Sequence, residues 1–310
     1  MDIDLVYLWV DGNDPAWQAK KNAFTRSDNS NEGRNCAGRY ADNDELLYSL
    51  RAVELYAPWI RRIFIVTDNQ VSKWLNLEHP KIKIIDHRDI LPSRALPSFN
   101  SAVIEHALHR IPDLAEHFLY ANDDMFFNRP VKPEDFFTSD GKPIIRFNRR
   151  PFRKLTLFLK QRIRQKPLSY YNRTICNSSE LVERKYGKYI GHKTHHNIDA
   201  YRLSDYRHTF ETFKDEIEAT FDNHIRNDND IQRNIYSFVP AIEKRSEVRF
   251  VSRKTSFRLH IDNPKHFAKL DKVNPMLFCL NDSEYANDAD RKRVAEYLQK
   301  RFPQKSEFEK

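Results

Sequence analysis

The sequence HFLYANDD spans residues 117–124 and joins an apolar run to two adjacent carboxylates. Its apolar and aromatic residues predict a buried strand, and the strand ends in Asn122, Asp123 and Asp124. Carboxylates are costly inside a core, so two of them at a strand end favour either a turn or a functional site.

The sequence on both sides of this stretch predicts strands that alternate with helices. In one predicted helix, Leu46, Leu50 and Val53 recur at helical spacing, Asp42 and Glu45 form a candidate capping pair, and Pro58 stands near the end. The predicted strands are 5–10, 62–69, 81–90 and 117–124, and the predicted helices are 42–60 and 98–111. This alternation predicts an α/β fold with a mostly parallel sheet covered by helices on both faces.

Polar residues follow three of the predicted strands. They are Asp11 and Asp14 after the first, residues 67–69 after the second and residues 122–124 after the fourth. One such turn is usually conformational, because Asp and Asn are common turn residues. Three turns at the carboxyl edge of one parallel sheet favour a ligand site.

The segments outside this pattern predict simpler features. Residues 16–38 are polar and predict a surface loop, and residues 167–190 predict an irregular insertion. VRFVS and SFRLHI, within 241–262, predict two short strands that pair antiparallel. The chain then predicts an amphipathic helix at its end, after the apolar run that precedes Asn281 and Asp282.

A strongly basic segment covers residues 146–166, where nine of 21 residues are Lys or Arg. Leu155, Leu159 and Ile163 share one helical face within it. Two interpretations stay open: a helix that binds a membrane surface or a polyanion, and a solvated helix that packs by one face.

Residues 192–236 are rich in His, Asp and Arg. His195, His196 and Asp199 are predicted on one side of a helix start, and Arg226 lies in a polar cluster before Ile231. Close histidines can bind zinc, but the H-E-x-x-H spacing is missing, and a lone histidine is more often a hydrogen-bonded surface residue.

Composition limits the classes of function. The chain has 310 residues, 40% of them hydrophobic, and a formal net charge of +8, which fits an anionic partner or simply a soluble basic protein. Cys36, Cys176 and Cys279 have no metal-site spacing and favour a reducing compartment. We see no secretory leader and no apolar run near the ~20 residues of a membrane span, so we expect a cytoplasmic protein.

The chemistry predicted for the strand ends is metal-assisted handling of phosphate. Only six glycines occur and no glycine-rich phosphate loop is present, so side chains and a metal must hold any phosphates. Adjacent aspartates suit Mg²⁺ or Mn²⁺ on a diphosphate, which indicates a nucleotide-sugar transferase. Arg39, Arg51 and Arg226 are candidates for the phosphate oxygens. Trp9 is a candidate for stacking on a base or sugar, with an ordinary core position as the alternative.

Four long blocks of this sequence resemble the Stealth family of sugar-1-phosphate transferases. The blocks begin with DIDLVYLWVDGNDP (2–15) and RYADNDELLYSLRAVELYAPWIRRIFIVTDNQVSKWLN (39–76), the latter continuing through LPSFNSAVIEHALHRI and FLYANDDMFFNRPVKPEDFF. HHNIDAYRL with HIRNDNDIQ form the third block, and FCLND (278–282) forms the fourth. The family includes bacterial capsular and exopolysaccharide phosphotransferases and the animal enzyme that phosphorylates lysosomal glycans.

The resemblance implies both a fold and a reaction. The fold is a Rossmann-like, glycosyltransferase-A-like domain with a mainly helical C-terminal part. In the reaction, an acceptor hydroxyl attacks the β-phosphorus of a UDP-linked sugar, a phosphodiester forms, and UMP leaves with help from Mg²⁺ or Mn²⁺. We expect the donated group to be a hexose 1-phosphate, from an N-acetylhexosamine.

The resemblance also assigns residues. Asp123 and Asp124 fall at the metal and phosphates, His196 at a catalytic histidine and Arg226 at a phosphate-binding arginine, although His195 beside His196 leaves either histidine as the acting one. The donor-binding blocks contain Asp11, Gly12, Asp14, Arg39, Asn43 and Glu45. Further substrate-binding candidates are Trp9, Arg51, Ser101, Asn122, Asn281 and Asp282.

Three hypotheses follow. The first is sugar-phosphate transfer to an oligosaccharide or polysaccharide in bacterial surface-polysaccharide synthesis, at the cytoplasmic face of the membrane and without nucleic acid. The second is a metal-dependent glycosyltransferase that releases UDP, and the third is a non-catalytic polyanion-binding protein. We expect one catalytic domain over 1–310, made of an α/β core at 1–145, a basic insertion at 146–190 and a C-terminal part at 191–310 that completes the site.

Overall fold

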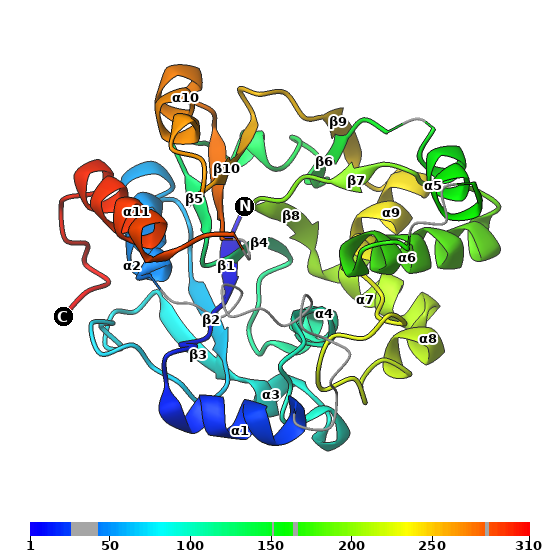
Figure 1. The fold of residues 1–310 in the computed structure, drawn as a ribbon, viewed down its shortest axis with the longest axis horizontal. Coiled ribbons are helices and arrows are strands. Elements are labelled where there is room, and N and C mark those ends of the chain that lie inside the picture. The colour runs from blue at the N-terminus through cyan, green and yellow to red at the C-terminus, as the bar shows by residue number, and fades with distance from the viewer. Residues whose placement is uncertain (26–42, 151, 164–166, 283–284) are drawn as a thin grey trace.

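The structure is a computed structural model that describes residues 1–25, 43–150, 152–163, 167–282 and 285–310. Its main sheet has the strand order β3-β2-β1-β4-β8 (Figure 1). The first four strands run parallel, and β8 pairs antiparallel with β4. Their bounds are β1 (Ile3–Leu8), β2 (Ile63–Thr67), β3 (Ile82–Asp86), β4 (His117–Asn122) and β8 (Asp199–Arg202). The predicted α/β fold with a mostly parallel sheet is confirmed.

Helices cover both faces of the main sheet because its strands alternate two apolar sets of side chains. Val6, Phe118 and Tyr120 face one core cluster, and Leu5 and Leu119 face the other. The first cluster lies under α4 (Ser101–His106), α6 (Tyr170–Tyr186), α7 (Leu203–Thr212), α8 (Lys214–Glu218) and α9 (Ile235–Ile242). The second lies under α2 (Glu45–Tyr56), and Figure 1 shows the two groups on opposite sides of the sheet.

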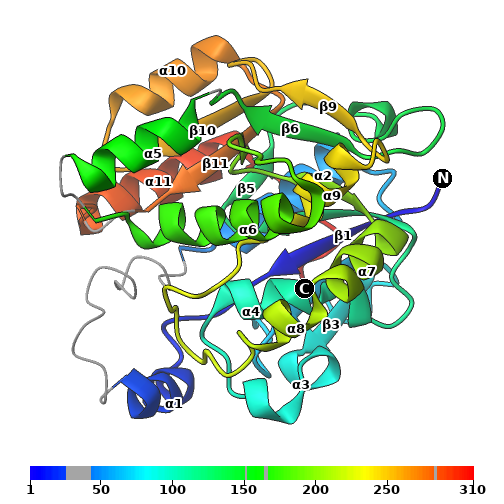
Figure 2. The same ribbon diagram turned by 90° about the vertical axis from the view of Figure 1, so that its right-hand side faces the viewer.

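Two small sheets complete the fold. One has the order β10-β11-β5, with β5 (Met125–Phe127), β10 (Ser256–His260) and β11 (Leu277–Asn281), and it carries α10 (Lys265–Val273) and α11 (Asp288–Arg301) on a core of its own. The other has the order β7-β6-β9, with β6 (Ile144–Asn148), β7 (Lys193–Thr194) and β9 (Glu247–Phe250). Figure 2 shows both above the main sheet. The part after residue 190 therefore pairs with strands from the first half, at β8 with β4 and at β11 with β5.

Several predicted elements were wrong. Residues 15–25 form helix α1 (Pro15–Thr25) instead of a loop, because the Asp14 carboxylate caps the Ala16 amide at 2.9 Å and Pro15 suits a first turn. The rest of that predicted loop, with Cys36 and Asp42, lies outside the described residues. Residues 170–186 form the 17-residue α6 instead of an irregular insertion, with buried Ile175 and Val182 on one face.

One predicted strand pairing and one predicted helix were also wrong. β9 and β10 do not pair with each other, because β9 runs parallel to β6 and β10 runs parallel to β11. Residues 195–199 do not start a helix, since residues 195–198 connect β7 to β8 and Asp199 is the first residue of β8. Part of the basic segment 146–166 belongs to β6, and part forms helix α5 (Arg153–Arg162). Residues 87–90, which were predicted to end the third strand, form helix α3 (His87–Ile90) instead.

None of the helices in the described ranges is both long enough and apolar enough to cross a membrane.

Candidate active site

A cavity of about 520 Å³ opens where β1, β4 and β11 end. The start of α4, the start of α6 and the connection between β7 and β8 form its other walls. Parallel strands present their carboxyl ends at one edge, which is where such sheets bind ligands. This cavity therefore lies at the edge of the sheet where the sequence predicted a site.

Asp123 and Asp124 form the turn between β4 and β5 and line this cavity. The Asp124 Oδ2 atom accepts a hydrogen bond from the Cys279 thiol at 3.4 Å, and within the described residues its buried Oδ1 atom has no hydrogen-bond partner. Burial raises the pKa of Asp124 to about 6, against the opposing effects of Cys279 and Arg258. A buried carboxylate oxygen without a donor fits a cation as its partner.

His196 stands next to this carboxylate. One ligand atom each from Asp124, His196 and Cys279 lie within 4.8 Å of one another, so the site brings together potential metal ligands from three separate segments. Burial, with further repulsion from Arg258 and Arg233, lowers the pKa of His196 to about 3. The imidazole is therefore neutral near pH 7 and has a nitrogen lone pair to offer.

The structure separates the two adjacent histidines. His196 lines the cavity, and His195 is not among the lining residues. The Nε2 atom of His195 instead lies 3.1 Å from Asp199 Oδ1, where only 2% of its side chain is exposed. Of the two histidines, His196 is therefore the one on the cavity wall, and its role in catalysis stays a prediction.

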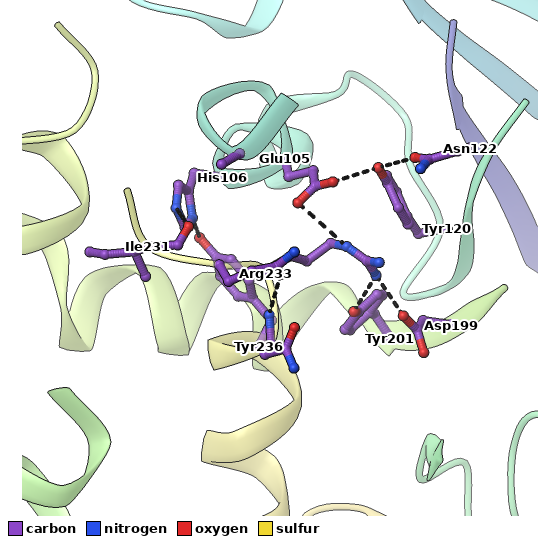
Figure 3. A network of polar contacts seen from close by, with 12 residues as sticks. Glu105, His106, Tyr120, Asn122, Asp199, Tyr201, Ile231, Arg233 and Tyr236 are labelled. Atoms are coloured by element: carbon purple, nitrogen blue, oxygen red, sulfur yellow. Dashed lines mark hydrogen bonds and ion pairs between the residues drawn. The ribbon is translucent and has the colours of Figure 1, made fainter. Parts of the chain in front are cut away.

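A buried polar network reaches the cavity wall through Arg233, Glu105 and Asn122 (Figure 3). Arg233 donates from Nη1 to Asp199 at 2.8 Å and to the Tyr201 hydroxyl at 2.6 Å, and its guanidinium lies 4.0 Å from the Tyr120 ring centre. Its Nε atom is 3.6 Å from Glu105 Oε2. Tyr120 donates to Glu105 at 2.8 Å, and its hydroxyl lies 2.7 Å from Asn122 Oδ1. The network thus connects Arg233 to the residue that precedes the aspartate pair.

Three arginines line the cavity, and the sequence pointed to one of them. Arg226 was predicted, whereas Arg233 and Arg258 were missed. Arg258 stands on β10 and donates to Asn281 Oδ1 at 2.9 Å. The only sequence signal for Arg258 was its alternation with apolar Phe257 and Leu259, which places it on the opposite face of β10. Other lining residues that the sequence did not single out are Trp17, Phe99, Glu105, Tyr170 and Tyr171.

Six further predicted substrate-binding residues line the cavity, namely Trp9, Glu45, Ser101, Asn122, Asn281 and Asp282. Trp9 is 6% exposed, so it belongs to the core and to the cavity wall at once. Asp282 pairs with Arg291 of α11 at 2.9 Å. Glu45 accepts hydrogen bonds from the backbone and side-chain nitrogens of Asn43, at 2.6 and 2.8 Å. The predicted capping pair of Glu45 with Asp42 falls outside the described residues. Binding of substrate by these residues stays a prediction.

The structure places the other predicted residues away from the lining. Asp11, Gly12 and Asp14 form the turn before α1, where Gln70 bridges Asp11 and Asp14. Asn43 donates two hydrogen bonds to the Glu45 carboxylate and is not among the lining residues. Arg51 forms an ion pair with Glu309 at 2.7 Å. Asp68, after β2, pairs with Lys20 at 2.7 Å. Of the three predicted turns, the turn after β4 is therefore the one that brings carboxylates to the cavity. Arg39 lies outside the described residues.

Comparison with known proteins identifies the family. Conserved regions 1 and 2 of Stealth proteins match residues 1–28 and 39–145. A capsular polysaccharide phosphotransferase of Haemophilus influenzae is 34% identical, over 92% of this chain and 79% of the relative. The chain belongs to the Stealth family. An exopolysaccharide phosphotransferase of Lactiplantibacillus plantarum is 31% identical over 100% of the chain and 96% of the relative.

Other Stealth relatives are longer than this chain. An exopolysaccharide phosphotransferase of Streptomyces coelicolor is 34% identical over 99% of the chain, which spans only 52% of that relative.

Among solved structures, the galactosyltransferase LgtC, in complex with donor and acceptor sugar analogues, is similar to this chain with a TM-score of 0.45 and 12% identity. The match covers 96% of this chain and 95% of LgtC. The third and fourth blocks of the resemblance stay a prediction.

Proposed function

We propose that this chain transfers a hexose 1-phosphate from a UDP-sugar to a hydroxyl of an oligosaccharide or polysaccharide, and releases UMP. The observation that carries the proposal is the gathering of Asp123, Asp124, His196 and Arg226 around one cavity. The family supports it, since its relatives are named capsular and exopolysaccharide phosphotransferases. An N-acetylhexosamine as the donated sugar, and action at the cytoplasmic face of the membrane, are parts of the proposal that stay predictions.

Mg²⁺ or Mn²⁺ fits the aspartate pair. The buried Oδ1 atom of Asp124 has no hydrogen-bond partner in the described chain, and Asp123 stands beside it on the cavity wall. Hard cations prefer such carboxylate oxygens, and a bound ion would neutralise charge on the diphosphate of the donor. Asp123 and Asp124 would hold the ion.

The remaining side chains have definite roles in the proposed reaction. The acceptor oxygen forms a bond to the β-phosphorus, and the bond from that phosphorus to the oxygen bridging the two phosphates breaks, so UMP leaves. A ring nitrogen of His196 accepts the proton of the acceptor hydroxyl, and the bound diphosphate favours the resulting imidazolium. Arg226 stabilises the charge on the phosphoryl oxygens, with Arg233 and Arg258 adding positive charge to the same cavity.

The released nucleotide tests this proposal. The protein is incubated with Mg²⁺ or Mn²⁺, a panel of UDP-sugars and short acceptor glycans, and nucleotides and products are identified by chromatography and mass spectrometry. We expect UMP in step with a new phosphodiester, and loss of both in Asp123→Asn and Asp124→Asn. Asp222→Asn, an exposed aspartate outside the cavity, is the matched control and should keep full activity.

The alternative outcomes are distinct. UDP with a new glycosidic bond would replace the proposal with a metal-dependent glycosyltransferase. Full activity in both aspartate variants would place the reaction elsewhere in the chain. Absence of either nucleotide with every donor, together with unchanged binding of anionic polymer by both variants, would favour the polyanion-binding hypothesis.

A further inference from the structure

Helix α5 exposes an apolar surface that is unusual for a helix lying on a protein core. Phe152, at its start, is 71% exposed, Leu155 is 56% exposed and Phe158 is 57% exposed. Leu159 is 40% exposed and Ile163 is 70% exposed. Five of the 13 exposed large apolar side chains in the described residues thus fall within 152–163, so they form a patch and not scattered single exposures.

In an ordinary surface helix the apolar side packs on the core, whereas in α5 the apolar side is the exposed one. Phe152, Leu155, Leu159 and Ile163 follow one another at three- or four-residue intervals, which places them on one side. Arg153, by contrast, is only 6% exposed, and Leu157 is half-buried, so these two residues mark the side that packs on the protein. The apolar side therefore faces away from the protein's own core.

The surroundings of this surface are positively charged. Residues 141–179 contain no Asp or Glu, and residues 146–166 contain nine Lys or Arg. Arg149, Arg150 and Arg162 are exposed beside or between the apolar residues. Lys154 is also exposed, but Glu183 of α6 pairs with it at 2.6 Å. Among the described residues, no carboxylate forms an ion pair with these three arginines. The combination of aromatic and aliphatic side chains with such arginines is the pattern of helices that lie in the interface of an anionic membrane.

We propose that α5 docks this protein on an anionic lipid bilayer, with Phe152, Leu155, Phe158, Leu159 and Ile163 entering the interface and the flanking arginines contacting lipid phosphates. An anionic polysaccharide would be attracted by the arginines alone and would leave five exposed apolar side chains unexplained. The apolar patch therefore favours lipid over a soluble polymer.

Docking through α5 would bring the cavity close to the membrane. Arg153 donates to the backbone oxygen of Asn172 in α6 at 3.5 Å, and Lys154 pairs with Glu183 of the same helix. The first turns of α6 carry Tyr170, Tyr171 and Thr174, which line the cavity. Figure 2 shows α5 and α6 side by side. The membrane surface would then lie one helix away from the site, whatever reaction that site performs.

Vesicle sedimentation tests the proposal. The full chain is mixed with vesicles of phosphatidylcholine, and separately with vesicles of equal parts phosphatidylcholine and phosphatidylglycerol. We expect binding to the mixed vesicles, weakening as salt is raised, and little binding to phosphatidylcholine alone. The triple variant Phe152→Ser/Leu155→Ser/Phe158→Ser should lose about tenfold or more in vesicle affinity, while its thermal unfolding stays unchanged because the three side chains are exposed.

The chain offers a matched control with the same kind of change elsewhere. Leu55, Val71 and Leu77 are 48%, 46% and 48% exposed, and the triple variant Leu55→Ser/Val71→Ser/Leu77→Ser should bind vesicles like the unmodified protein. Nucleotide release with soluble donor and acceptor should be the same in both triple variants, which separates membrane docking from the proposed reaction.

Each contrary result would overturn the proposal. If the α5 triple variant bound vesicles as strongly as the unmodified protein, the lipid contact would lie elsewhere in the chain. If the unmodified protein did not sediment with the mixed vesicles, it would have no such lipid contact. If the unmodified protein were a dimer in solution and the α5 triple variant were a monomer, the patch would be assigned to contact with a second copy of the chain. Binding to a soluble anionic polysaccharide that depends on Arg149, Arg150 and Arg162 but not on the apolar residues would assign the surface to that polymer.

Discussion

The Cys279 thiol donates a hydrogen bond to the Asp124 carboxylate at 3.4 Å, from strand β11 to the turn after β4. The two residues are 155 positions apart in the sequence. The Leu280 backbone oxygen, at 3.1 Å, is a second acceptor for the same thiol hydrogen. The other carboxylate oxygen of Asp124, Oδ1, is buried and has no hydrogen-bond partner among the described residues. The thiol is thus a positioning residue for the proposed metal ligand.

Replacing Cys279 by Ala should weaken metal activation of the proposed transferase. Without the thiol, Asp124 loses its orienting donor, and such partners of metal ligands typically contribute 10- to 100-fold in metal affinity. We expect the Mg²⁺ or Mn²⁺ concentration for half-maximal activity to rise by about that factor, with a smaller rise for Cys279→Ser, which keeps a donor. Cys176→Ala, at the other buried free cysteine in the described chain, serves as the control. An unchanged metal requirement in Cys279→Ala would show that the hydrogen bond does not position the carboxylate.

Arg51 should prove structural. Its guanidinium donates from Nε and Nη2 to Glu309 at 2.8 and 2.7 Å and from Nη1 to the Phe302 backbone oxygen at 2.8 Å, which fastens the C-terminal segment to α2. Arg51→Met should lower the free energy of unfolding by about 1–3 kcal/mol, because it leaves the nearly buried Glu309 carboxylate without its cation.

The same variant decides between a structural role and the substrate-binding role that the sequence suggested for Arg51. We expect the KM for the donor to stay within about twofold of the unmodified protein. Arg51→Lys should recover only part of the stability, since an ammonium cannot make the two-pronged contact. A large rise in KM with unchanged thermal unfolding would restore the substrate-binding role.

The parts of the fold that the sequence predicted are those specified by local pattern. Val6 and Leu119 belong to strands with unbroken apolar runs, and Leu46 and Leu50 recur at helical spacing, so these elements were assigned from periodicity alone. The partner of a strand is not a local property. Phe257 and Leu259 indicated a strand, but nothing near them showed that it would run beside β11 instead of β9.

The site divides in the same way. Asp123 and Asp124 were predicted because the strand end that carries them is visible in the sequence, and the cavity does lie there. Arg233 was missed because its role depends on contacts with Asp199, Tyr201 and Glu105, 32 to 128 positions away along the chain, and neighbouring sequence carries no trace of them. Asp11 and Asp14 lie outside the cavity lining, in a turn and a cap that use the same residue types as a ligand site, so the sequence does not distinguish the two.

Removing Arg233 should destabilise the fold. Arg233→Met would leave Asp199, 6% exposed, and Glu105, 8% exposed, without their buried cation. Breaking a buried pair from one side typically costs about 3–5 kcal/mol. Denaturant unfolding should show a loss of that order. Arg88→Met, whose side chain is 67% exposed and pairs loosely with Asp86, should change stability by less than about 1 kcal/mol. A loss in Arg233→Met no larger than in Arg88→Met would mean that the network is not held by its charges.

His106 should make the protein less stable in mild acid. Its ring is fully buried, with Nε2 donating to the Ile231 backbone oxygen at 3.0 Å and Nδ1 accepting from the Tyr236 hydroxyl at 2.9 Å, which fixes a neutral tautomer. Burial lowers the pKa of His106 from 6.5 to about 4. Above pH 6.5 neither the folded nor the unfolded chain binds a proton at this ring, so its contribution to stability is complete there.

Between pH 6.5 and about 4 the unfolded chain takes up a proton that the folded chain refuses, so the free energy of unfolding falls as pH falls. For this ring alone the loss is on the order of 3 kcal/mol across that window. Denaturant unfolding from pH 7 to pH 4 should show a shallower slope in His106→Asn than in the unmodified protein. Tyr236→Phe removes the hydrogen bond without removing the titrating group, so it should lower stability at every pH and keep most of the slope. A slope that is the same in His106→Asn and the unmodified protein would show that another group carries the acid sensitivity.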